Sequence, residues 1–194
     1  GTRPNDLATL LEYYQKKAED PEFVLEEEEC EALGQEGLQF YHRYICLLRL
    51  GDFDRVISDT NHNLAIFDLV AKHSKGDEQK TMVEQYRPYV TMVNTRARGE
   101  LRLLNDDYDG ALTIVDRGIE RIQRLLSALD DPDLSKDREE IHALEAWRQE
   151  ITENRPVSHK QRLAEQLREA IAEEKYERAA VLRDRLRGLE KNRL

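Results

Sequence analysis

Cysteine, proline and glycine are scarce in this chain, and each scarcity excludes a class of structure. Two cysteines among 194 residues are too few for a disulfide-stabilised scaffold and indicate a protein of the reducing cytoplasm. Five prolines and nine glycines supply little material for the many turns of a β-rich fold. No apolar run approaches the roughly 18 residues of a membrane-spanning helix, so we expect neither a membrane protein nor a secretory signal peptide.

Charged residues, in contrast, are abundant. They make up 36% of the chain, against 39% hydrophobic residues. Apolar residues recur with a period near 3.6 in nearly every segment, a pattern typical of long, well-solvated helices. We therefore predict an all-α protein built from antiparallel helical hairpins, with a larger domain over residues 1–154 and a smaller hairpin over residues 157–194.

The net charge of −10 is unevenly distributed between these two parts. Residues 157–194 carry 10 Lys and Arg against 7 Asp and Glu, a net charge of +3. The rest of the chain carries 20 against 33, a net charge of −13. Because an acidic body repels the phosphate backbone, we expect no direct binding of nucleic acid.

Local signals place the helix boundaries of the larger domain. An opening helix is expected after a cap at Asn5 or Asp6. A strongly apolar helix is expected over Gln39–Leu50, with the acidic run Glu26–Glu29 on its N-terminal side, where carboxylates favour the positive end of a helix. Pro88 is expected to kink or split a later helix, because it lacks an N–H and its ring clashes with the preceding turn.

One pair of helices in this domain resembles a tetratricopeptide (TPR) repeat. Gly99, Tyr108 and Ala111 match the small–aromatic–small spacing at which the helices of such a repeat pack closely. An earlier pair carries Phe53 at its turn, but Tyr44 stands where a small residue is typical. The two turn aromatics are 55 residues apart, whereas TPR repeats recur about every 34 residues. The resemblance therefore implies a degenerate, right-handed TPR-like array.

Two apolar stripes near the C-terminus indicate a helical hairpin folded at Lys175 and Tyr176. Its first helix follows a capping-box pattern over Ser158–Gln161. The stripe of that helix consists of Leu163, Leu167, Ala170 and Ile171. The stripe of the second helix consists of Tyr176, Ala179, Ala180, Leu182, Leu186 and Leu189. Because so small a hairpin is expected to leave its apolar face unburied, it should dock on another polypeptide surface.

The order aromatic-Glu-x-Ala-Ala-x-Leu-Arg-Asp-x-Leu-x-x-Leu, from Tyr176 to Leu189, resembles the UVR motif. That motif closes the repair proteins UvrB and UvrC, and it recurs in ClpC-type chaperones and their McsA-like regulators. The resemblance implies a bacterial protein whose C-terminal hairpin binds other proteins, often another UVR hairpin. It covers the hairpin alone, since the sequence lacks the helicase blocks of UvrB, the nuclease domain of UvrC and the zinc-binding Cys pairs of McsA.

The resemblance also implies which residues of the hairpin contact a partner. The expected contact residues are Leu167, Ile171, Tyr176, Ala179, Ala180, Leu182 and Leu186. The two alanines would let the helices approach closely, whereas Arg183 and Asp184 would set the partner's orientation through ion pairs at the rim. The expected partner is a protein with its own UVR motif or a second copy of this chain.

Catalytic and metal-binding signatures are weak. Phosphate-binding loops, HExxH, GxSxG and CxxC are all absent from the sequence, so we expect neither an enzyme nor a cofactor. The segment from Asn105 to Asp116 has oxygen ligands at EF-hand spacing but lacks the final Glu, and an interhelix turn with a capping Asp is the alternative. His42 and Cys46, with the distant Cys30, form a candidate metal set; the alternative is a buried thiol beside a half-exposed ring.

Arginines cluster on the second TPR-like pair. Arg96, Arg98 and Arg102 lie on its first helix, the helix that lines the concave groove in a TPR domain. There they would clamp a carboxylate or an acidic peptide. The alternative is a solvated face on which arginines pair with neighbouring acidic residues, namely Glu100, Asp116 and Glu120.

Together these patterns predict a non-catalytic adaptor or regulatory subunit. The helical body and the hairpin would each bind a protein partner, by resemblance within a Clp-type protease or stress-response system. One alternative is an accessory protein of UvrABC-type excision repair. The other is a hairpin that docks on its own body and has only a structural role.

Overall fold

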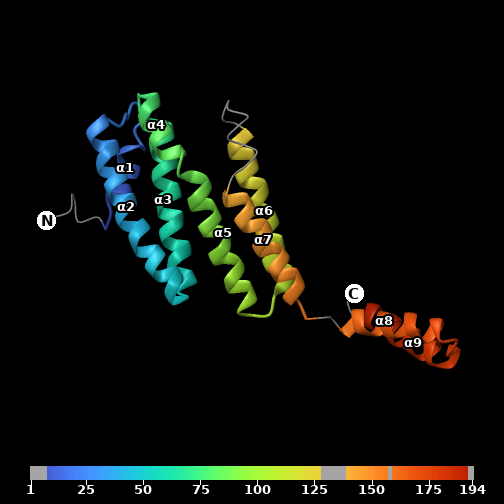
Figure 1. Cartoon of the computed structure of the whole chain (residues 1–194). Coiled ribbons are helices and arrows are strands. Elements are labelled where there is room, and N and C mark those ends of the chain that lie inside the picture. The colour runs from blue at the N-terminus through green and yellow to red at the C-terminus, as the bar shows by residue number, and fades with distance from the viewer. Residues whose placement is uncertain (1–7, 128–138, 157–158, 192–194) are drawn as a thin grey trace. The chain divides into compact units, whose positions relative to one another are not determined.

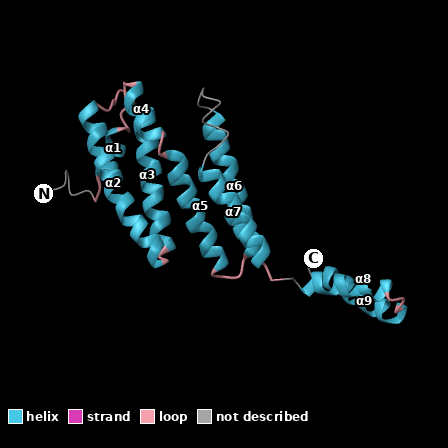
Figure 2. Cartoon of the chain, in the orientation of Figure 1, coloured by secondary structure: helices cyan, strands magenta, loops and turns pink. Residues whose placement is uncertain are grey.

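The computed structural model describes residues 8–127, 139–156 and 159–191, and over these residues the chain is all-α (Figure 2). This confirms the predicted fold class. Contacts divide the chain into two compact units, Gly1–Glu153 and Asn154–Leu194, which we call the body and the hairpin. None of the helices that the structure describes is long and apolar enough to cross a membrane.

The body contains seven of the described helices (Figure 1). They are α1 (Leu10–Lys17), α2 (Glu27–Leu50), α3 (Phe53–His73), α4 (Asp77–Glu84), α5 (Arg87–Leu103), α6 (Tyr108–Ser127) and α7 (Glu139–Asn154). Helices α2, α3, α5 and α6 lie side by side in that order. The hairpin consists of α8 (His159–Ala172) and α9 (Tyr176–Lys191).

The first helix begins later than predicted, whereas the second begins at the acidic run, as expected. Helix α1 starts at Leu10, where the Thr9 hydroxyl accepts a hydrogen bond from the Glu12 N–H at 3.2 Å; the expected caps Asn5 and Asp6 lie outside the described residues. The predicted apolar helix is the second half of the 24-residue α2. The acidic run forms its first turn, because the Glu29 carboxylate accepts from the Glu26 N–H at 3.0 Å in a capping box.

Local chemistry explains the breaks between the next helices. Gly51 ends α2 in a left-handed conformation with φ of 72°, which only glycine adopts freely, and Asp52 caps α3 by accepting from the Arg55 N–H. The split predicted at Pro88 is confirmed, since α4 ends at Glu84 and α5 begins at Arg87. Proline is tolerated in the first turn of α5, where its missing N–H has no helical partner.

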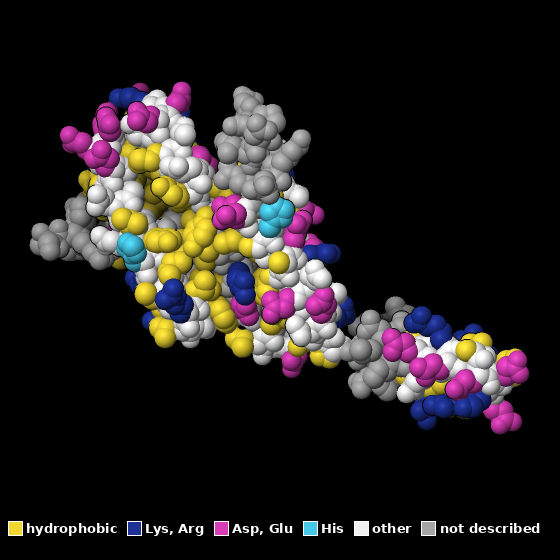
Figure 3. Space-filling model, viewed as in Figure 1, with side chains coloured by type: hydrophobic (Ala, Val, Ile, Leu, Met, Phe, Trp, Pro, Cys, Tyr) yellow, Lys and Arg dark blue, Asp and Glu magenta, His cyan; other side chains and the backbone are white. Residues whose placement is uncertain are grey.

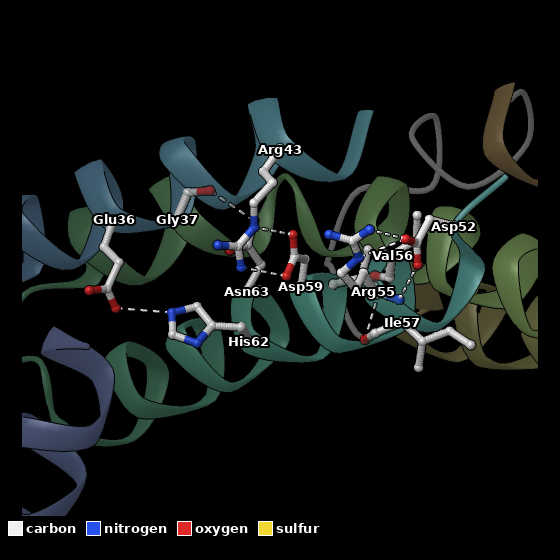
Figure 4. Close-up of polar contacts among 11 residues, drawn as sticks. Glu36, Gly37, Arg43, Asp52, Arg55, Val56, Ile57, Asp59, His62 and Asn63 are labelled. Carbon is white, nitrogen blue, oxygen red and sulfur yellow. Dashed lines mark hydrogen bonds and ion pairs between the residues drawn. The ribbon is translucent and has the colours of Figure 1, made fainter. Parts of the chain in front are cut away.

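Polar side chains align α2 with α3 (Figure 4). Arg43 donates two hydrogen bonds to the buried Asp59, at 2.7 and 2.6 Å. His62 contacts Glu36 at 2.9 Å, and Asn63 donates its amide N–H to the Gly37 carbonyl at 3.0 Å. Because each pair joins one specific residue on each helix, these contacts fix the register in which α3 packs on α2.

The TPR-like residues of α5 and α6 are packed as close-approach positions. Ala111 is fully buried, and a Cβ on Gly99 would meet the Trp147 ring at 2.6 Å. A Cβ on Gly118 would meet the Thr95 side chain at 2.4 Å, so glycine lets α5 and α6 approach each other. Gly99 thus makes its closest side-chain approach to α7. The right-handed TPR-like array remains a prediction.

Candidate protein-interaction site

The two helices of the hairpin pack on each other through a narrow apolar seam. Leu163, Ala170, Ala179 and Leu182 are buried in it. Leu167 and Leu186 pack against these four and are partly buried. Alanine at two of the buried positions lets the helices come close, as the prediction for Ala179 supposed, but it also makes the seam thin.

A tight turn over Glu173–Lys175 joins the helices, one to two residues before the predicted fold point. The Lys175 N–H donates to the Ala170 carbonyl at 2.8 Å, and the Glu174 N–H donates to the Ile171 carbonyl at 3.1 Å. This is the hydrogen-bond pattern of a Schellman motif, in which Glu174 takes the left-handed position with φ of 58°. The predicted capping box at Ser158 lies outside the described residues.

The predicted contact residues fall into two groups. Ala179 and Leu182, with 7% and 4% of their surface exposed, pack inside the seam. Ile171 and Tyr176, in contrast, are 52% and 67% exposed. Both flank the turn, so they lie at the same end of the hairpin. The expectation that the hairpin cannot bury its own apolar face therefore needs correction: it buries the seam and leaves the residues beside the turn uncovered.

The remaining predicted hairpin residues lie between these extremes. Ala180 is partly buried, as are the two leucines at the edge of the seam. Arg183 and Asp184 are exposed and pair with each other, at 3.1 and 3.2 Å. Sequence reasoning missed Val181, which is 54% exposed. Its only signal was an apolar residue lying off the predicted stripe.

The three candidate groove arginines have partners in different elements. The Arg96 guanidinium lies over the Trp147 ring of α7 at 4.9 Å. Arg98 donates to Asn94 on its own helix at 2.8 Å, and Arg102 pairs with Asp107 in the following loop at 3.2 Å. The structure therefore does not gather the three guanidinium groups into one site.

The alternative, a solvated face on which these arginines pair with neighbouring acidic residues, describes only some of the ion pairs in the structure. Arg96 pairs with Glu100 one turn later at 3.5 Å, as that alternative expects. Asp116 instead accepts from Arg148 of α7 at 2.6 Å. This second pair links α6 to α7 and stabilises their packing by a modest amount, because both side chains are half exposed.

The EF-hand-like segment has the arrangement of an interhelix turn. Asp107 accepts from the Gly110 N–H at 2.9 Å and so caps the start of α6. At the other end of the segment, the Asp116 carboxylate is engaged by Arg148. The described residues contain no group of three His, Cys, Asp or Glu side chains placed to hold a metal ion.

The candidate metal set of His42, Cys46 and Cys30 is likewise dispersed. His42 and Cys46 are exposed on α2, whereas Cys30 is buried. The alternative of a buried thiol at Cys46 is therefore wrong. Burial, together with nearby carboxylates, raises the pKa of the Cys30 thiol, which keeps it protonated as an ordinary core residue.

Comparison with protein families identifies the hairpin. A family model described as the UvrB/uvrC motif (UVR) matches residues 160–192, which supports the predicted resemblance. A motif of this kind is a non-catalytic interaction module. No family model supports a TPR-like body. Searches of curated proteins and of solved structures found no significant match.

Proposed function

We propose that this protein is a non-catalytic adaptor or regulatory subunit whose UVR hairpin binds a second UVR hairpin, on a partner protein or on another copy of this chain. The observation that carries this proposal is the exposure of Ile171 and Tyr176 beside the turn of a hairpin whose seam is already filled. The body would bind a further partner protein, so that this chain would connect the partner of the hairpin with the partner of the body.

The energetics favour an interface at this end of the hairpin. Covering a large apolar side chain contributes about 1.5–3 kcal/mol. Ile171 and Tyr176 are each more than half exposed, so an interface over both supplies a substantial part of a specific binding energy. Tyrosine is also among the residues enriched at the centres of interfaces, because it combines apolar area with a hydroxyl.

The predicted contact residues take different roles in this proposal. Ile171 and Tyr176 would contact the partner directly. Ala179 and Leu182 would act indirectly, because they hold α8 and α9 together. Arg183 and Asp184 would exchange their mutual ion pair for pairs with the partner, which changes specificity more than affinity.

A Clp-type protease or stress-response system is the context that we propose. Residues 1–156, which include the body, carry a net charge of −13, and this disfavours a protein that must lie against DNA. The description of the matched family favours a second candidate, an accessory protein of UvrABC-type excision repair. Both contexts use the same hairpin surface.

The test measures binding of the full chain to UVR hairpins from ClpC-type, McsA-like and UvrB proteins, and its self-association by light scattering. The double variant Ile171→Ser/Tyr176→Ser should weaken whichever association occurs by at least about tenfold. Glu165→Ser, another exposed change on α8, serves as the control and should leave it unchanged. A wild-type chain that stays monomeric and binds none of the hairpins would refute the proposal and favour a structural role.

A further inference from the structure

We propose that a groove in the body, between α2 and the α4–α5 segment, binds an amphipathic helix with basic flanks from a partner protein. This inference rests on the proposed function in one respect, namely that the body binds a partner. It names the surface and the chemistry of that partner, neither of which the UVR motif specifies.

The groove is large, open and apolar. Its volume is about 930 Å³, near the upper end of pockets that hold one small molecule. Helix α3 forms its floor with Ile66 and Phe67. Along its sides Leu38, Met82 and Tyr86 are 53%, 40% and 57% exposed, so the groove is open to solvent along its length. Hydrophobic side chains gather on this face of the body (Figure 3).

Two glycines of α2 lie along the groove. Gly34 and Gly37 are three residues apart, so they lie on the same helical face, and both line the groove. A Cβ on Gly34 would meet no atom within 4 Å. Each glycine costs a helix interior about 1 kcal/mol relative to alanine. The missing side chain of Gly34 leaves space beside α2 in which another helix can approach closely. Gly37 is buried, and a Cβ there would meet Asn63 and Ile66 of α3 at 3.6 and 3.7 Å.

Two buried polar groups along the groove have no hydrogen-bond partner among the residues that the structure describes. They are the hydroxyl of Tyr44, which is fully buried, and the Oδ1 of Asn63, which is 3% exposed. The Asn63 amide N–H is bound to the Gly37 carbonyl, so its oxygen stays available as an acceptor. An unpaired buried group of this kind costs about 1–3 kcal/mol. A ligand that supplies a donor would remove that cost.

The charges of the groove select among apolar ligands. Glu31 and Glu140 are the charged residues that line it, and none of the described lining residues is Lys or Arg. The body around it is also strongly acidic. A partner with Lys or Arg beside its apolar stripe would therefore be attracted, and one with Glu or Asp there would be repelled.

An amphipathic helix meets all of these requirements. Its apolar residues at i, i+3, i+4 and i+7 form a stripe that fills an elongated groove. Its basic side chains can reach the carboxylates of Glu31 and Glu140, which line the groove. A compact small molecule would fill the floor but leave Leu38 and Tyr86 exposed.

The experiment uses the full chain and two labelled synthetic helical peptides with the same leucine stripe, one with lysine flanks and one with glutamate flanks. In fluorescence anisotropy the lysine peptide should bind at least about tenfold more tightly. Gly34→Leu places a Cβ where no atom lies within 4 Å and a larger side chain at the groove, so it should weaken that binding by at least about tenfold. Gln39→Leu adds the same side chain to an exposed position of α2 outside the groove and should have no effect.

Several outcomes would overturn the inference. Equal binding of both peptides would remove the preference for basic flanks, and unchanged binding by Gly34→Leu would exclude the groove. Self-association abolished by Gly34→Leu would identify a second copy as the occupant. The Ile171→Ser/Tyr176→Ser variant should bind the lysine peptide normally, whereas Gly34→Leu should bind UVR hairpins normally, so the two proposals can fail separately.

Discussion

The body and the hairpin are built from the same amphipathic helices, but they differ in what covers each apolar face. In the body, α3 packs against α2 and α5, and its core contains large side chains such as Tyr44, Leu33 and Ile66. In the hairpin, each helix packs against one other helix. A single pairing buries one stripe and leaves apolar residues outside it exposed. The period of the apolar residues therefore predicts the helices. The number of helices that pack against each one determines which apolar surfaces stay exposed.

The polar contacts of the two units also differ, because those of the body join different helices and those described in the hairpin do not. In the body, buried or half-buried pairs such as Arg43 with Asp59 join different helices. In the hairpin, the ion pairs that the structure describes join neighbours in sequence, as Arg183 does with Asp184 and Lys175 with Glu173. Pairs between distant residues restrict how helices pack, and pairs between neighbours do not. The ion pairs described in the hairpin therefore do not join α8 to α9.

The largest effect that we expect is on the body. Trp147→Ala removes a ring that packs against Gly99, and glycine has no side chain to fill the space. The free energy of unfolding should fall by about 3–5 kcal/mol, the usual cost of deleting a buried aromatic. Urea denaturation followed by circular dichroism measures it. A loss below about 1 kcal/mol would mean that the body does not depend on this contact.

A smaller and more local effect is expected in the hairpin. Leu182→Ala should destabilise the seam by about 2 kcal/mol, the low end for a buried leucine, because small alanines surround it. Hydrogen exchange should show faster exchange within residues 159–191, since the contacts of Leu182 lie there. Equal acceleration across α3 and α5 would show that the two units unfold together. Val181→Ala, an exposed change on the same helix, is the matched control.

The smallest effect depends on pH. Burial opposes ionisation of Glu36, but hydrogen bonds from His62 and from the Leu10 and Leu11 N–H groups outweigh it and lower the pKa of the carboxyl. The resulting stabilisation is complete above the ordinary value of 4.5 and is lost as the pH falls through the lower folded-state pKa. Glu36→Gln should cost about 1 kcal/mol at neutral pH.

The control for that prediction is the pH profile itself. The Glu36→Gln chain should lose less stability than the wild type as the pH falls below 4.5, because it has no carboxylate to protonate at this position. Urea midpoints measured at several pH values give both profiles. Parallel profiles would show that Glu36 does not contribute to acid sensitivity. They would also show that the polar contacts of α2 contribute little to the stability of the body.

Much of the helical layout could be predicted from local chemistry. Pro88, and the Gly51–Asp52 turn, mark helix ends through properties of the residues themselves, and the structure confirms both. The acidic run Glu26–Glu29, expected on the N-terminal side of the second helix, forms the capped first turn of α2, because carboxylates are favoured at the positive end of a helix.

The sites were less predictable, since they depend on residues far apart in sequence. Gly34 and Tyr86 line one groove although 52 positions separate them, and only the packing of α2 beside α4 and α5 brings them together. For Arg96, Arg98 and Arg102, sequence spacing gives a helical face, but it does not give the element that packs against that face, such as α7 with Trp147 beside Arg96. In the hairpin, periodicity predicted the seam residues, but not that Ile171 and Tyr176 would remain outside it.

Trp147 has one further consequence, for spectroscopy. It is the single tryptophan of the chain, it is 5% exposed, and the Arg96 guanidinium lies over its ring. Its fluorescence should therefore be emitted at short wavelength and resist quenching by iodide while the α5–α7 region is folded. Because the hairpin has a tyrosine, Tyr176, but no tryptophan, the tryptophan emission of the native protein, excited selectively, reports on the body alone.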